Sequence, residues 1–150
     1  MSVTTVFALT FGDRVEYLTY WQNSWLWAPP VWNSLIKHYI NPVGGFWGDE
    51  DLSKLWKLTT NQSVPKFARA VLSMTFYGAY IRAADFKVAQ DDIAKYHQMF
   101  PKAKHFEALQ LLMDTTDAPA LCFWANSVED NPWNGPIDWT KTFDVYKSGL

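Results

Sequence analysis

The chain has 150 residues, of which 49% are hydrophobic and 19% are charged, and its formal net charge is −2. Intrinsic disorder requires low hydrophobicity and high charge, so this composition excludes it, and the length suffices for one domain over residues 1–150. Neither the whole chain nor either half is basic enough to predict direct nucleic-acid binding.

The first third of the chain predicts a β-hairpin followed by a helix. Residues 3–11 and 14–21 are rich in β-branched and aromatic residues, and Gly12-Asp13 between them is typical of a tight turn. A helix capped by Asp13 is the competing interpretation of the second segment, and we prefer the hairpin. Pro29-Pro30 then suits the first turn of a helix. Apolar residues follow with helical spacing, namely Val31, Trp32, Leu35, Ile36, Tyr39 and Ile40.

The middle of the chain predicts mainly helices. Residues 49–58 form a short helix with three carboxylates at its positive end, and Ser63 caps the next helix. Residues 74–81 are expected to form a strand. Asp85 then opens a helix that Pro101 ends, and residues 102–113 form another.

The last third predicts two strands separated by a loop. Residues 120–127 are strand-like, residues 131–138 contain two prolines and a glycine and so form a loop, and residues 140–146 form a terminal strand. Strands therefore flank the helical runs at both ends. We expect an α+β domain with about five helices and a small antiparallel or mixed sheet of about three to five strands.

Cysteine use and hydropathy indicate the compartment. The single Cys122 cannot form an internal disulfide, which favours a reducing, cytoplasmic setting. No apolar run approaches the ~20 residues of a membrane span, so we expect no membrane association. The N-terminal segment lacks a basic leader, and we expect no signal peptide.

Residues with the potential for chemistry do not form a recognisable motif. Gly44-Gly45 precedes a helix start but lacks the Lys and Ser/Thr of a phosphate loop. The three histidines are not spaced as zinc ligands, and Cys122 lies in an apolar strand where a thiol is usually inert. We therefore predict no catalytic residue, no metal and no cofactor.

The nine tryptophans are the most informative feature of the sequence. Trp32 and Trp56 lie on apolar helix faces and Trp124 lies in a strand, so all three are predicted to pack in the core. Five others lie near Gly or Pro, where a ring either covers the core or is exposed at a binding surface. These candidate binding residues are Trp25, Trp27, Trp47, Trp133 and Trp139.

Two functional hypotheses follow. Residues 59–105 carry an excess of basic groups and residues 106–150 an excess of acidic groups, and this asymmetry could orient a partner. Together with the loop aromatics it favours a non-enzymatic interaction protein that binds another macromolecule, most simply a protein, as an inhibitor or immunity-type protein does. The alternative is a nucleotide- or sugar-binding protein, or a small enzyme, with an aromatic-lined pocket. Its polar contacts would come from Arg69, Arg82, Asp85 or His38.

Overall fold

A two-stranded hairpin opens the fold, as the sequence predicts. In the computed structural model, which describes residues 3–23, 26–43, 48–125 and 131–147, strand β1 (Val3–Thr10) pairs with the antiparallel strand β2 (Arg14–Gln22). The competing prediction of a helix from Asp13 is therefore wrong. Because Thr10 pairs with Arg14, the turn has three residues, and both Gly12 and Asp13 adopt positive φ angles (95° and 61°). Glycine adopts such angles without steric cost, and Asp tolerates them better than most residues.

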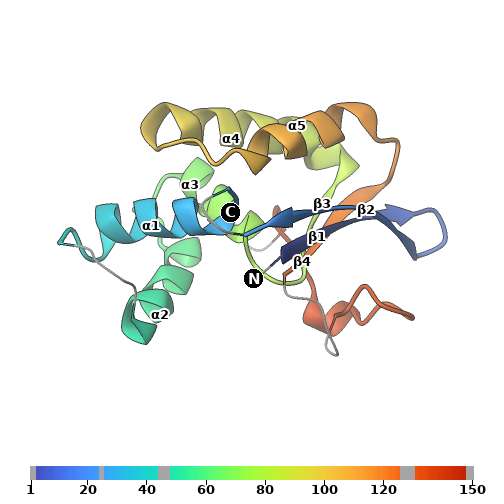
Figure 1. The fold of residues 1–150 in the computed structure, drawn as a ribbon, viewed down its shortest axis with the longest axis horizontal. Helices are drawn as coiled ribbons and strands as arrows, with labels where there is room; N and C mark the ends of the chain where they lie inside the picture. The colour runs from blue at the N-terminus through green and yellow to red at the C-terminus, as the bar shows by residue number, and fades with distance from the viewer. Residues whose placement is uncertain (1–2, 24–25, 44–47, 126–130, 148–150) are drawn as a thin grey trace.

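The hairpin forms one side of a five-stranded mixed sheet in the described part of the chain. The strand order is β2-β1-β4-β3-β5, with β3 at Ala79–Arg82, β4 at Ala120–Ala125 and β5 at Phe143–Asp144. The β3–β5 pair is parallel and the other pairs are antiparallel. Strand β4 therefore lies between the N-terminal hairpin and β3 (Figure 1). This arrangement brings strands from both ends of the chain into one sheet.

Helices fill the chain between β2 and β4. They are α1 (Ala28–Tyr39), α2 (Asp49–Lys57), α3 (Lys66–Met74), α4 (Phe86–Met99) and α5 (His105–Thr115). Pro29 and Pro30 occupy the first turn of α1, where a missing N–H costs nothing. The described residues thus form an α+β domain with five helices and five strands, which confirms the predicted fold class.

The predicted cap of the third helix is wrong. Helix α3 begins at Lys66, directly after Pro65. The hydroxyl and the backbone N–H of Ser63 both donate to Oδ1 of Asn61, at 2.6 and 3.0 Å. This local Asx-type turn competes with the helix and holds Ser63 outside it.

The boundaries of three other predicted elements also change. Met74 ends α3, and the strand predicted over residues 74–81 begins only at Ala79, after a turn in which Gly78 has a φ of 78°. Helix α5 begins at His105 rather than at residue 102. The terminal strand shrinks to the two residues of β5, because the carboxylate of Asp138 accepts from the backbone N–H of Thr140 (3.1 Å) and starts a 3-10 turn, η3 (Trp139–Lys141).

The two faces of the sheet are covered by different parts of the chain. Helices α4 and α5 lie side by side over one face, and the segment from residue 131 to η3 lies on the opposite side (Figure 1). The buried strand residues of the helix-covered face include Val6, Ala8, Ile81, Leu121 and Phe123. On the opposite face, Cys122 is buried between Phe7 and Tyr80, its partners in register. The second layer is therefore built from a loop instead of helices.

Candidate binding site

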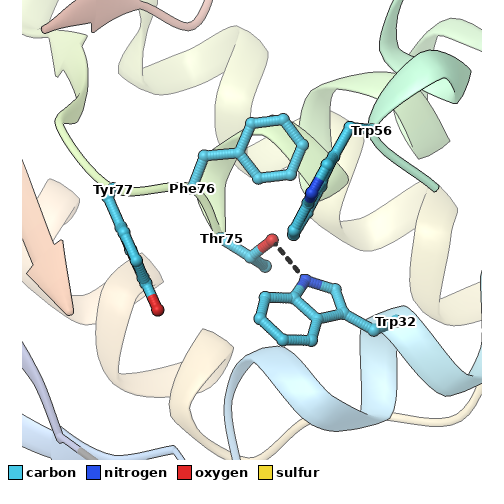
Figure 2. Close-up of a pocket in the computed structure, with 5 residues that line it drawn as sticks. All are labelled: Trp32, Trp56, Thr75, Phe76 and Tyr77. Atoms are coloured by element: carbon cyan, nitrogen blue, oxygen red, sulfur yellow. Dashed lines mark hydrogen bonds between the residues drawn. The ribbon is translucent and has the colours of Figure 1, made fainter. Parts of the chain in front are cut away.

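An aromatic pocket lies between α1, α2 and the connection from α3 to β3. Its volume is about 420 Å³, and it is lined by Trp32, Trp56, Thr75, Phe76 and Tyr77 (Figure 2). We refer to it below as the aromatic pocket. Its wall is largely apolar, because four of the five lining residues present rings.

Each ring occupies the edge of a buried helix face or follows a helix end. Trp32 follows the buried Val31 on α1, and Trp56 follows the buried Leu55 on α2. Neighbouring helix positions point about 100° apart, so a ring next to a core residue lies at the border of the core. Thr75 ends α3 by donating from its backbone N–H and from its hydroxyl to the carbonyl oxygen of Leu72 (3.0 and 2.6 Å).

Perpendicular ring contacts fix the shape of the pocket. The Trp32 and Trp56 rings are 5.3 Å apart at 87°, and the Trp56 and Phe76 rings are 4.5 Å apart at 89°. Nε1 of Trp32 donates to Oγ1 of Thr75 (2.9 Å). Edge-to-face pairs are the favoured geometry of aromatic rings, so this cluster is held without a ligand.

Tyr77 closes the pocket from the other side. Figure 2 shows its ring on one side of Thr75, while the rings of Trp32, Trp56 and Phe76 are grouped on the other. Tyr77 packs against Trp124 of β4 (5.6 Å, 50°), which ties this wall to the sheet. Tyr77 and Trp56 retain 49% and 38% exposure, so the rim of the pocket is accessible to a partner.

The chemistry of the pocket is that of apolar recognition. Among its five described lining residues there is no carboxylate, amine, imidazole or thiol. The hydroxyl of Thr75 already accepts from Trp32 and donates to Leu72. The pocket can therefore bury an apolar group, and its other side-chain polar groups are the hydroxyl of Tyr77 and the indole N–H of Trp56.

Two of the loop tryptophans predicted as binding residues are core residues instead. Trp27 and Trp133 are each 1% exposed. Trp27 stacks on Phe106 of α5 (4.4 Å) and packs against Trp21 (4.8 Å) and Phe123 (6.0 Å), on the helix-covered face of the sheet. Trp133 donates from Nε1 to the carbonyl oxygen of Phe123 (3.1 Å) and covers the second face of the sheet. Irregular backbone places a residue outside a helix or strand, but it does not prevent its ring from folding back onto the sheet.

Trp139 differs from these two. Trp139 lies in η3 with 43% exposure, and it lines a second hollow with Arg82. Trp25 and Trp47 lie outside the described residues. Trp32 and Trp56, both predicted as core, instead form the wall of the aromatic pocket, and for Trp56 the prediction of burial is wrong. The sequence signal was their position at the border of an apolar helix stripe.

The polar residues of the small-molecule hypothesis lie on four different elements. Arg69 on α3 is buried and donates from Nε to the carbonyl oxygen of Val64 (3.0 Å). His38 is exposed on α1 and packs against the rings of Tyr39 and Phe100. Asp85 is partly buried at the start of α4, and Arg82 at the end of β3 pairs with Asp144 (3.0 Å). In the part of the chain that the structure describes, these four side chains do not form one cluster.

The described residues also provide neither a cluster of potential metal ligands nor a reactive thiol. The described residues hold no group of three or more His, Cys, Asp or Glu side chains arranged to bind a metal ion. Burial raises the pKa of the Cys122 thiol to about 12, and the backbone near Leu9 opposes this only in part. A thiol in that environment is protonated at neutral pH and is a poor nucleophile.

The fold and the site define an α+β protein with an apolar, aromatic surface pocket. Comparisons with protein-family models, with curated proteins and with solved structures give no match. Within the described ranges, no helix combines the length and the apolar character needed to cross a bilayer. The function is therefore argued from the geometry of the site.

Proposed function

We propose that this chain is an interaction protein that binds a partner protein, and that the aromatic pocket receives an apolar side chain of that partner. The observation that carries this proposal is a pocket of about 420 Å³ whose rim exposes Trp56 and Tyr77. Large, rigid aromatic side chains dominate the energetics of protein interfaces, because they bury much area at little entropic cost. A volume of this size accommodates a Leu, Met or Phe side chain.

The small number of polar groups among Trp32, Trp56, Thr75 and Phe76 favours an apolar occupant, since the indole N–H of Trp32 and the hydroxyl of Thr75 are bonded to each other. A polar ligand loses its hydrogen bonds to water when it enters an apolar site, and each unsatisfied group costs about 1–3 kcal/mol. The Thr75 hydroxyl cannot compensate, since it is both donor and acceptor within the protein. An aliphatic or aromatic side chain has no such loss.

The charge along α2 supports a partner with a basic group beside its apolar anchor. Asp49 lies seven residues before Trp56, so the two share one face of the helix about 10 Å apart along its axis. Glu50 is already paired with Lys54 (3.1 Å), whereas Asp49 is exposed. A Lys or Arg of the partner at this distance from the anchor would contribute to the association rate more than to affinity.

A capture experiment with matched variants tests the proposal. The wild-type protein, Trp56→Ala, Tyr77→Ala and Trp139→Ala are immobilised and exposed to lysate of the native host. We expect a stoichiometric partner that wild type and Trp139→Ala retain and that the two pocket variants bind at least about thirtyfold more weakly, or about 2 kcal/mol. Trp139 is the control because it is similarly exposed but does not line the pocket. Equal capture by all four proteins contradicts the proposal.

A cross-linking experiment locates the contact. A photoreactive phenylalanine analogue at position 77 should form a covalent adduct with the captured partner. The same analogue at the exposed position 17, on β2, is the control and should give none. A partner that is cross-linked from position 17 but not from position 77 binds elsewhere, and the pocket then has another role.

A further inference from the structure

A second hollow, of about 530 Å³, lies at the end of the sheet where β1 and β3 end and β4 begins. Leu9, Ala120 and Arg82 are neighbours in register across these three strands and line it. Trp139 of η3 and Asp13 of the hairpin turn also line it. It shares no lining residue with the aromatic pocket.

The ring of Trp139 is held as a platform. It contacts Tyr80 at 5.8 Å and 75°, and Trp133 at 6.0 Å and 85°. Tyr80 and Trp133 in turn meet at 5.9 Å and 87°. Because the buried Trp133 and the strand residue Tyr80 fix its orientation, the exposed part of Trp139 is ordered before a ligand arrives, which lowers the entropic cost of binding.

The polar groups of this hollow combine donors with acceptors. Arg82 uses Nε to bind the buried carboxylate of Asp144 (3.0 Å), and a side-chain hydrogen bond also links its guanidinium to Tyr80. A guanidinium has five N–H donors, so this half-exposed group retains donors beyond these two contacts. Asp13 supplies a carboxylate, which only accepts. Asp13 and Arg82 are the charged residues that line the hollow, and their opposite charges sum to zero, so the hollow offers no excess positive charge for a phosphate or a carboxylate.

We propose that this hollow binds a neutral pyranose unit of an oligosaccharide. One face of a pyranose presents C–H groups with a partial positive charge, which suits the negative face of the Trp139 ring. Its hydroxyls both donate and accept, so adjacent hydroxyls match the carboxylate of Asp13 and the Nη groups of Arg82. Binding is noncovalent and independent of the partner protein proposed for the aromatic pocket.

Titration with defined sugars tests this site. The probes are maltotriose, cellotriose and the N-acetylglucosamine trimer, with AMP as a charged, stackable comparison. Binding is followed by calorimetry and by the indole N–H signals in the NMR spectrum, with the Trp139 signal assigned from Trp139→Phe. We expect at least one trisaccharide to bind saturably below about 10 mM, to shift the Trp139 signal and to bind more tightly than AMP.

Variants separate this site from the aromatic pocket. Trp139→Ala should weaken trisaccharide binding at least about tenfold, and Asp13→Asn should weaken it less because an amide still accepts a hydrogen bond. Trp56→Ala is the control and should bind the sugar as wild type does, since Trp56 lies in the other pocket. The proposal is overturned if no trisaccharide binds, if AMP binds more tightly, or if Trp139→Ala retains full affinity. None of these outcomes affects the partner-protein proposal.

Discussion

The hydroxyl of Tyr146 donates a 2.9 Å hydrogen bond to Oδ2 of Asp92, a buried carboxylate that lies 54 residues earlier, on α4. The backbone N–H of Tyr146 donates to Oδ1 of Asp144 (3.0 Å), and the amine of Lys66 lies 5.7 Å from the centre of its ring. Burial, and then the negative charge of Asp92, raise the pKa of Tyr146, so its hydroxyl remains a donor across the physiological range. The chain after β5 is thereby attached to both α3 and α4.

Tyr146→Phe should reduce the free energy of unfolding by about 1–3 kcal/mol, because it leaves the buried carboxylate of Asp92 without this donor. Urea denaturation of the variant and of wild type measures the change. Tyr17→Phe is the control, since Tyr17 is exposed on β2 and its loss should be smaller. An unchanged midpoint for Tyr146→Phe would show that the hydrogen bond contributes nothing to stability.

Gly78→Ala should destabilise the protein more than Gly12→Ala does. Both glycines have positive φ angles, which cost an L-residue roughly 1–2 kcal/mol. At Gly78 the added Cβ would also overlap the backbone carbonyl of Lys141, whereas at Gly12 nothing lies within 4 Å. Thermal denaturation of the two variants compares the costs, and equal losses would mean that the 139–142 segment moves aside freely.

Stability should fall as the pH drops below neutrality, because two half-buried histidines resist protonation. Burial lowers the pKa of His97 and of His105 from the usual 6.5, and Lys102 and Lys104 respectively add to the effect. Nε2 of each is buried without a hydrogen-bond partner in the described part of the chain. Between pH 6.5 and the lowered pKa values of the folded protein, the unfolded chain binds more protons than the folded chain does. The free energy of unfolding therefore decreases as the pH falls through this range.

Urea denaturation at about pH 7.5 and about pH 5.5 tests this pH dependence. The difference between the free energies of unfolding at the two pH values should be smaller in the double variant His97→Gln/His105→Gln than in wild type. If the double variant keeps the whole pH dependence, other groups are responsible.

Local sequence signals predicted the elements well because local physics forms them. Gly12-Asp13 adopts the positive φ angles of a hairpin turn, and Pro29-Pro30 lies in the first turn of α1. The prediction failed where a β-rich segment overlapped the end of a helix. The β-rich residues 74–81 begin at the last residue of α3, and the turn around Gly78 decides where the strand begins.

The candidate site was predicted less well, since exposure of a ring depends on contacts that are distant in sequence. Trp133 is buried because the chain after β4 folds back over the sheet. Trp56 is exposed because α2 meets α1 and the 75–77 turn only along one edge, and helical periodicity cannot distinguish the centre of a buried face from its border. Arg82 and Trp139 were both predicted as contacts, but only the sheet topology brings them to one hollow.

Cys122 should react with thiol reagents far more slowly in the folded protein than in urea. The side chain is buried between two strands, and burial raises its pKa to about 12, so little thiolate forms at neutral pH. The rate of modification by a chromogenic disulfide reagent measures this. Fast native labelling at pH 7 would show that the chain after β4 opens readily over this face.

The tryptophans should separate into those that hold the fold and those that are free to bind. Trp27→Ala and Trp133→Ala should each cost about 3–5 kcal/mol, because each leaves a large cavity among buried groups. Trp56→Ala and Trp139→Ala should cost less than about 2 kcal/mol, since both rings are already partly in water. Urea denaturation of the four variants tests the division. Should Trp133→Ala be tolerated as well as Trp139→Ala, the segment over the second sheet face is not part of the core. In that case the platform beneath Trp139, and the sugar site that depends on it, would lose their structural support.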